Sequence, residues 1–166
     1  TAIFGRPFAD IDASRVTQRL TETVESRGLG EVGLYRVSGS QAGIQSIRAA
    51  FNQKGVDHVD LNAVGDVNEV TCVLKLFYRE APEPAIPVDM REAFIRGGNG
   101  IEGDIEGAAR VFGMLPSEIG GALRILFAHL HKYEGGKKGK IYERYLFDGV
   151  CIDMTFCYDD KDITFL

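Results

Sequence analysis

Apolar residues spaced three or four apart constrain this chain more than any other feature, because that spacing places them on one face of an α-helix. The pattern recurs over residues 12–27, 44–51, 66–80 and 116–133. In the third segment, five residues would share about 120° of the helix circumference: Val67, Val70, Val73, Leu74 and Phe77. A chain with these stripes is expected to fold as a mainly α-helical domain.

Residues that favour helix ends bound these segments. Asp12 or Ser14 can cap the first helix, and Gly28 stands at the C′ position after it. Later boundaries carry comparable signals: an S-x-x-Q capping box from Ser38 to Gln41, a D-x-x-E variant from Asp66 to Glu69, Pro82 after the third helix, and Gly135 with Gly136 after the fourth. Weaker helical patterns cover residues 88–96 and 104–114.

The last 25 residues have a different composition. The stretch YLFDGVCIDMTFCYDD, residues 145–160, is rich in aromatic and β-branched residues and contains a hairpin-type Asp-Gly dipeptide at Asp148. A helix and a hairpin both fit this stretch. The whole chain, residues 1–166, is expected to form one all-α, multi-helix domain in which only these C-terminal residues are left open.

Charge and composition exclude several classes of function. The net charge of −5 and the pI of 5.2 argue against a nucleic-acid binder that neutralises many phosphates. Three cysteines cannot all pair and none forms a C-x-x-C motif, so we expect free thiols in the cytoplasm. No long apolar run and no signal peptide is present, so any membrane contact is expected through a partner or missing domains. Because residue 1 is Thr1, we expect a domain cut from a longer protein.

Motifs that could bind a cofactor or a metal have poor support. The G-x-G-x-x-G pattern in residues 98–103 follows a helical pattern, so an interhelical loop is favoured over a dinucleotide site. His129 and His131 would point about 200° apart on a helix, which favours solvent or core contacts over a shared metal. The run KKGK at 137–140 gives weak support to a lipid-binding domain. No cofactor and no metal site is predicted.

A single arginine, Arg36, interrupts the apolar residues of EVGLYRVSGS, residues 31–40. On a helix over 66–80, Lys75 and Arg79 would lie one turn apart on the face opposite the apolar stripe. Two such cations can be solubilising charges only. If Arg36 points toward the same side, three cations would converge on a surface suited to a negatively charged partner, such as a nucleotide-bound acidic surface.

Two longer motifs carry a resemblance to a known family. GLGEVGLYRVSGS at residues 28–40 and DVNEVTCVLKLFYREAPEP at 66–84 together resemble the GTPase-activating domain of the RhoGAP (breakpoint-cluster-region homology) family. FGRPF at 4–8 and LPSEIGGALRILFAHL at 115–130 are similar to further parts of such domains. The resemblance covers about residues 4–130, whereas 131–166 diverge. It implies an all-helical fold, in agreement with the periodicity.

The resemblance implies that Arg36 is an arginine finger. It would be inserted in trans into the active site of a Rho, Rac or Cdc42-type GTPase in its GTP-bound state. The GTP, the Mg²⁺ and the attacking water would belong to the partner, so the domain would have no catalytic site of its own. The residues expected to bind the partner or to support the finger loop are Lys75, Arg79, Gly33, Gly39 and Ser38.

The chain departs from the family after residue 130. Family members usually continue with an N-K-M…N-L-A…F-G-P segment whose second asparagine contributes to the GTPase-facing site, whereas this chain reads GKIYERYLFDGVCI at 139–152. Lys140 and Leu146 stand near the asparagine positions, and neither side chain can both donate and accept as an amide does. A GTPase activator is the leading hypothesis. The alternative is a non-catalytic module of the same fold that binds a small GTPase.

Overall fold

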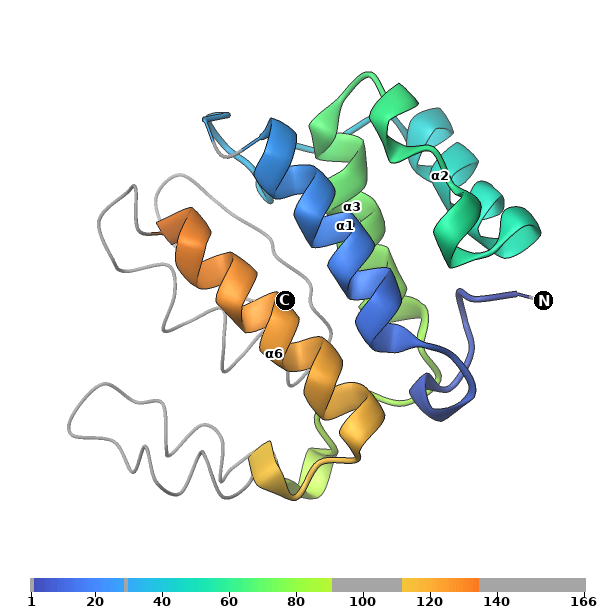
Figure 1. The fold of residues 1–166 in the computed structure, drawn as a ribbon, viewed down its shortest axis with the longest axis vertical. Coiled ribbons are helices and arrows are strands. Elements are labelled where there is room, and N and C mark those ends of the chain that lie inside the picture. Colours follow the sequence, from blue (N-terminus) through green and yellow to red (C-terminus); the bar gives the residue numbers. More distant parts are fainter. Residues whose placement is uncertain (1, 29, 91–111, 135–166) are drawn as a thin grey trace.

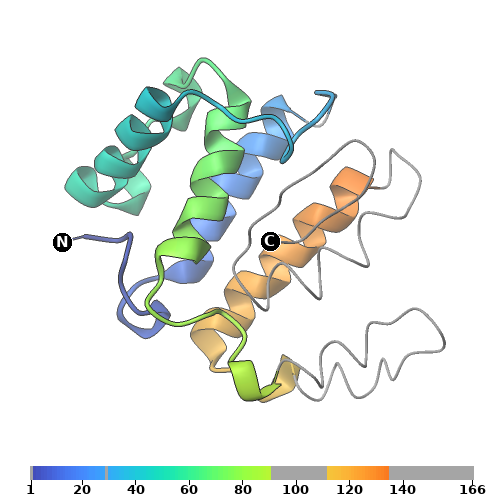
Figure 2. The same ribbon diagram turned by 180° about the vertical axis from the view of Figure 1, so that it is seen from behind.

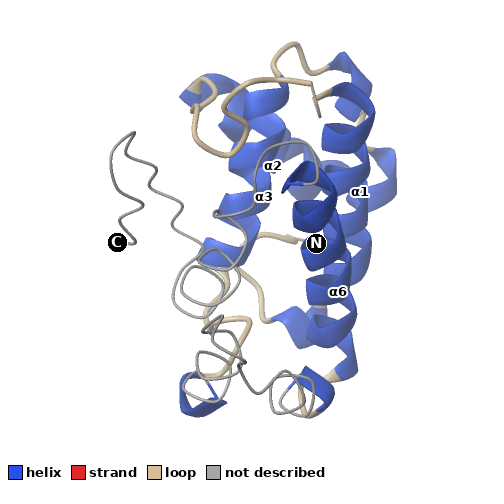
Figure 3. Ribbon diagram, turned by 90° about the vertical axis from the view of Figure 1, so that its left-hand side faces the viewer, coloured by secondary structure: helices blue, strands red, loops and turns tan. Residues whose placement is uncertain are grey.

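The computed structural model describes residues 2–28, 30–90 and 112–134. Every regular element in those residues is a helix (Figure 3), which confirms the expected all-α class for this part of the chain. The α-helices are α1 (Ala13–Arg27), α2 (Gln41–Lys54), α3 (Val67–Glu80) and α6 (Ser117–Glu134). Short 3-10 helices are η1 (Phe8–Asp10), η2 (Val56–His58), η3 (Leu61–Ala63) and η4 (Val88–Met90).

Helix α1 lies between α6 and α3, and α2 packs against α3 on the side away from α6 (Figures 1 and 2). The segment 30–40 leaves the end of α1 and crosses to the start of α2 (Figure 1). Since α1 contacts both α3 and α6, this segment is placed where side chains from all three helices can reach it. The fold thereby brings residues far apart in the sequence to one end of the helix layer.

The core is made by the stripes that the periodicity predicts. All five predicted residues of α3 are buried, and α2 buries Ile44, Ile47 and Phe51 as expected. The largest fully buried side chains come from all four α-helices of the described residues and from one loop: Leu20, Phe51, Leu74, Phe77, Leu123, Leu126 and Ile86. Burial of such side chains contributes about 1.5–3 kcal/mol each before ordering costs.

The N-terminal segment belongs to this core. The ring of Phe4 packs edge to face with Phe51 of α2 at 6.0 Å and with Phe77 of α3 at 5.6 Å between centroids. The side-chain oxygen of Asn52 accepts hydrogen bonds from the amides of Ile3 and Phe4, at 2.7 and 3.0 Å. The chain ahead of α1 is therefore fixed between α2 and α3.

Two of the predicted helix ends need correction. Ser40, not Ser38, caps α2, because its hydroxyl accepts from the amide of Gly43 at 3.0 Å. Gly28 ends α1 with a φ of −128°, so it is not the left-handed C′ glycine of a common cap. Glycine is needed there for another reason, since a Cβ would lie 2.9 Å from Cγ2 of Val67 in α3. Asp12 caps α1 as predicted, accepting from Arg15 N at 2.9 Å.

Several predictions fall outside the described residues. Of the expected helix over 88–96, only the turn η4 lies within them. Of the one over 104–114, only residues 112–114 are described, and 112–113 are helical. The glycine motif at 98–103, the KKGK run and the C-terminal stretch with Lys140 and Leu146 also lie outside the described part of the chain.

Candidate functional site

Arg36 lies in a tight turn of the segment between α1 and α2. The carbonyl of Gly33 accepts from the amides of Arg36 and Val37, at 3.0 and 2.9 Å. Gly33 and Tyr35 both have left-handed backbone, with φ of 87° and 67°. The Arg36 side chain is exposed, and so are its apolar neighbours Val32 (74%) and Val37 (42%). The turn therefore presents a cation beside two exposed valines.

The glycines on either side of Arg36 make room for atoms of this chain. A Cβ at Gly33 would lie 3.0 Å from Cγ2 of Val37 and 3.6 Å from Nε of Arg36. A Cβ at Gly39 would lie 2.5 Å from Cγ of Glu69 and 2.6 Å from its backbone nitrogen. The family resemblance implied that both glycines bind the partner or support the finger loop. The structure gives each an internal packing reason, and a role toward a partner stays a prediction.

Lys75 of α3 reaches the turn. Its ammonium donates to the backbone carbonyl of Tyr35, the residue before Arg36, at 3.0 Å. Lys75 is half-buried, and a hydrogen bond from a charged group contributes about 1.5–3 kcal/mol where it is shielded from water. The predicted proximity of Lys75 to Arg36 is thus present, through the backbone of the adjacent residue.

Glu69 of α3 holds the other end of the segment. The hydroxyl of Ser40 donates to Oε1 of Glu69 at 2.6 Å while accepting from the amide of Gly43. The Glu69 carboxylate also occupies the space that a Cβ at Gly43 would need. Ser38, which the sequence suggested as a loop-supporting residue, is exposed and does not cap α2.

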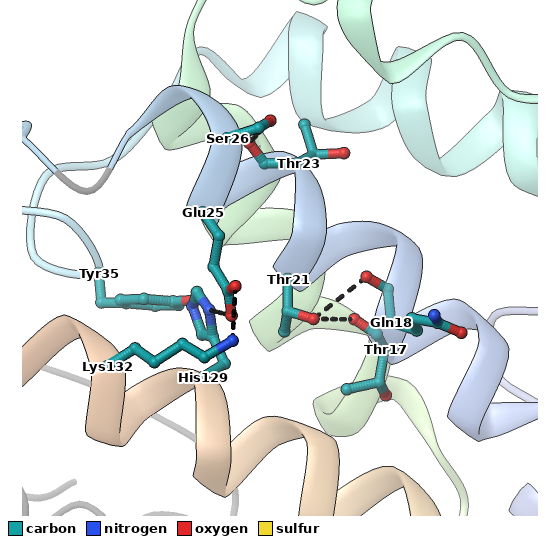
Figure 4. Close-up of polar contacts among 9 residues, drawn as sticks. All are labelled: Thr17, Gln18, Thr21, Thr23, Glu25, Ser26, Tyr35, His129 and Lys132. Carbon is teal, nitrogen blue, oxygen red and sulfur yellow. Dashed lines mark hydrogen bonds and ion pairs between the residues drawn. The ribbon is translucent and has the colours of Figure 1, made fainter.

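The side chain of Tyr35 is buried in the protein, whereas that of Arg36 is exposed. Its hydroxyl hydrogen-bonds to Nε2 of His129 in α6, and the two rings meet edge to face at 5.7 Å (Figure 4). Nδ1 of His129 lies 3.0 Å from Oε1 of Glu25 in α1. The other carboxylate oxygen accepts from Lys132 at 3.0 Å. Four side chains from α1, α6 and the turn are therefore linked in one chain of hydrogen bonds.

Burial sets the protonation of this cluster. His129 is 1% exposed, and desolvation lowers its pKa, although the Glu25 carboxylate opposes that effect. Burial would raise the pKa of Glu25, but hydrogen bonds from Lys132 and His129 bring it below its ordinary value. A neutral His129 must donate its Nδ1 proton to the carboxylate, so Nε2 is left to accept from Tyr35. Each polar atom of the cluster then has a defined donor or acceptor role.

The structure joins some of the predicted residues and leaves others apart. Lys75 meets the backbone next to Arg36, whereas Arg79, one turn further along α3, is exposed and makes no hydrogen bond or ion pair with any described residue. Sequence reasoning missed Glu25, the contact of Glu69 with the segment and the role of His129. Of the solvent or core contacts expected for His129, the structure shows a core position. A signal was present for His129, because it falls on the buried stripe of α6, where a polar side chain needs a partner.

Neither a metal site nor a membrane span is found within the described ranges. No group of three or more His, Cys, Asp or Glu residues there is arranged to hold a metal ion. No helix there is both long and apolar enough to cross a membrane.

The amino-acid sequence matches a known domain family over most of its length. The family model described as "RhoGAP domain" matches residues 14–137. Rho GTPase-activating protein 15 of Rattus norvegicus is 38% identical over 113 residues, which cover 67% of this chain and 23% of that protein. N-chimaerin of Homo sapiens is 36% identical over 112 residues, covering 66% of this chain and 24% of that protein. The chain therefore belongs to the RhoGAP domain family.

Solved structures share the fold. The crystal structure of human Rho GTPase-activating protein 15 superimposes with a TM-score of 0.75 and 29% identity, covering 90% of this chain and 74% of the other. The BH domain from Graf, the GTPase regulator associated with focal adhesion kinase, gives a TM-score of 0.71 at 21% identity over 84% of this chain and 78% of the other, which supports the fold alone. The chain spans about a quarter of the length of the curated relatives named above.

Proposed function

We propose that this domain activates a small GTPase of the Rho family by inserting Arg36 into its active site in trans. Membership of the RhoGAP family and the names of the relatives, Rho GTPase-activating protein 15 among them, support the class of activity. The observation that carries the mechanism is the turn itself, where an exposed arginine follows a residue fixed from α3 and α6. A turn whose backbone is held in this way loses little freedom when the arginine that follows enters a partner.

The chemistry requires a planar cation. As GTP is hydrolysed, charge develops on the oxygens around the transferred phosphoryl group, and a guanidinium can donate several fixed hydrogen bonds to them. In Ras- and Gα-type GTPases such a finger accelerates hydrolysis by about 10³–10⁵, or roughly 4–7 kcal/mol. Lysine cannot reproduce the fork of donors. Nucleotide, Mg²⁺ and attacking water come from the partner in this proposal, and its proposed location is the cytoplasm.

The remaining residues have supporting roles in the proposal. Lys75 holds the backbone ahead of the finger, and Gly33 and Gly39 allow the tight path of the segment. Arg79, exposed on the same face of α3 as Lys75, contacts the GTPase rather than the loop. Val32 and Val37 add apolar contacts next to the finger, since exposed apolar residues beside a charged group are typical of protein interfaces.

The test is single-turnover GTP hydrolysis by Rho, Rac and Cdc42-type proteins with and without the domain. Arg36→Ala should abolish stimulation and leave binding largely intact, because a contact made in the transition state changes kcat far more than ground-state affinity. Arg36→Lys should recover little. Arg6→Ala is the matched control, since Arg6 is an exposed arginine that precedes α1, whereas the turn follows the other end of that helix. Full stimulation by Arg36→Ala would refute the finger assignment.

A second candidate is a module that binds the GTPase without accelerating hydrolysis. The observation in its favour is the sequence at 139–152, which lacks the asparagines usual in the family. The two candidates separate in one assay. Saturable binding of the GTP-bound GTPase with an unchanged hydrolysis rate, for wild type and Arg36→Ala alike, would support the binding module.

A further inference from the structure

Tyr35 has an unusual backbone conformation. Its φ of 67° is the only left-handed value at a non-glycine residue in the described ranges. Such backbone is sterically unfavourable for a residue with a Cβ and persists only where the surroundings hold it. Tyr35 directly precedes Arg36, so any change in its backbone angles redirects the arginine.

Two helices hold Tyr35 from opposite directions. Lys75 of α3 binds its carbonyl at 3.0 Å, and His129 of α6 binds its hydroxyl. The tyrosine is 4% exposed, so its bond to His129 is shielded from bulk water, and its bond to Lys75 is partly shielded. The carbonyl fixes the backbone and the hydroxyl fixes the side chain. Together they leave the residue before Arg36 little freedom to rotate.

His129 is itself fixed by charge. Glu25 of α1 accepts from Nδ1, and Lys132 of α6 pairs with the same carboxylate. Within the described residues, Glu25 and Tyr35 are the titratable groups that hydrogen-bond to the imidazole. This arrangement orients the ring so that Nε2 faces the tyrosine (Figure 4). A His held by a carboxylate is a common device for orienting a polar group, because the second hydrogen bond removes the free rotation of the imidazole.

We propose that His129, oriented by Glu25, is a positioning residue for Arg36 and acts through the hydroxyl of Tyr35. This inference rests on the proposed function and adds a residue on α6 to the machinery of that site. His129 touches neither GTP nor the GTPase in this scheme. It keeps Tyr35 in the backbone conformation that aims the guanidinium outward. A displacement of about 1 Å at a catalytic group can lower a rate by up to about 100-fold, so a loss of part of this anchoring is expected to be measurable.

Tyr35→Phe is the sharpest variant, because it removes one oxygen and keeps the ring. Tyr78→Phe is its matched control: the Tyr78 hydroxyl is also buried and bonds to Thr17 of α1 at 2.7 Å, away from the turn. At saturating domain concentration we expect Tyr35→Phe to lower the stimulated rate by about 3- to 10-fold. The half-saturating concentration should change by less than about twofold, since the binding surface is retained. Tyr78→Phe should leave both quantities at the wild-type value.

A second pair tests the histidine. His129→Leu removes the acceptor and should match the loss in Tyr35→Phe, with no further loss in the double variant, because both changes break the same hydrogen bond. His129→Gln retains an acceptor at similar reach and should recover most of the rate. If Gln and Leu behave alike, or the double variant loses the product of the single effects, the proposed route from His129 through Tyr35 is wrong.

Amide hydrogen exchange of the free domain separates this inference from the proposed function. The amides of Arg36 and Val37 are bonded to the Gly33 carbonyl, and we expect them to exchange faster in Tyr35→Phe but not in Tyr78→Phe. If wild type stimulates no GTPase, the proposed function fails and this measurement alone decides the anchoring. Unchanged exchange in Tyr35→Phe, or an equal increase in both variants, would overturn the inference.

Discussion

The contact between Gly39 and Glu69 gives a prediction with a worked magnitude. In Gly39→Ala, the new methyl would lie 2.5 Å from Cγ of Glu69, 2.6 Å from its backbone nitrogen and 2.7 Å from its Cα. Real Cβ atoms essentially never approach other heavy atoms that closely, so something has to move. A flexible side chain could give way, but two of these atoms belong to the first turn of α3. The segment before α2 and the start of α3 must therefore separate.

The cost follows from overpacking. Extra methyl groups in tightly packed sites cost about 1–3 kcal/mol, and the backbone contacts place Gly39→Ala at the upper end, about 2–3 kcal/mol. For a chain of this size each kcal/mol lowers Tm by about 2–4 °C, so we expect a decrease of about 4–12 °C. The displaced segment also carries Arg36, so the stimulated GTPase rate should fall together with Tm.

Gly65→Ala is the matched control for this experiment. Gly65 also lies in a loop before a helix, but a Cβ there would have no heavy atom within 4 Å. The substitution should be neutral or stabilise by about 0.4–1 kcal/mol, because alanine restricts the unfolded chain. Thermal unfolding followed by circular dichroism measures both variants. Melting of Gly39→Ala within about 1 °C of Gly65→Ala would show that the close approach of α3 to this segment is not as described.

Three further predictions concern the anchors and the core. Lys75→Met should speed amide exchange at Arg36, since it removes the charged donor to the preceding carbonyl, whereas Arg79→Ala should not; equal exchange in both would contradict this. Because the folded pKa of His129 lies below 6.5, the unfolded chain binds the proton more tightly, so the free energy of unfolding should be constant above about pH 7.5 and fall as the pH drops through 6.5. Urea unfolding at pH 7.5 and 5.5 should show a smaller fall in the free energy of unfolding for His129→Gln than for wild type. An equal fall in the two proteins would show that His129 does not cause the pH dependence. Phe4→Ala should lower the free energy of unfolding by about 3–5 kcal/mol in urea titrations, and a loss below about 1 kcal/mol would mean that the ring is not part of the core.

The helices could be predicted because their signals are local. Apolar stripes and caps lie within a single turn or two of the chain, and burial of the stripe decides the rest. The same locality explains the errors at their ends. Ser38 and Ser40 both precede a helical pattern, and Ser40, which caps α2, also bonds to Glu69, 29 residues away in α3. The need for glycine at position 28 likewise comes from another helix, because Val67 of α3 occupies the space that a Cβ would fill.

The site could be predicted in part for similar reasons. Helical spacing placed Lys75 opposite the apolar stripe, and the structure puts it beside the turn. Arg79 shares that face but lies about 6 Å further along the axis, which takes it away from the segment. The contacts from His129 to Tyr35 and to Glu25 join residues 94 and 104 positions apart. No local pattern encodes such pairs, although a histidine on a buried stripe does indicate that a polar partner exists.

Phe4 belongs to the hydrophobic core although it lies ahead of the residues that match the family model. The residues that match the family model begin at 14, within the first turn of α1, yet the ring of Phe4 fills the space between α2 and α3. A fragment that begins at residue 14 would keep every matched residue but would lose the buried side chain of Phe4 from its core. Its remaining helices would either close over a cavity or expose Phe51 and Phe77 to water. For this chain, the match to the family model begins after residues that pack into the hydrophobic core, so anyone moving the domain into another protein has to carry the preceding residues with it.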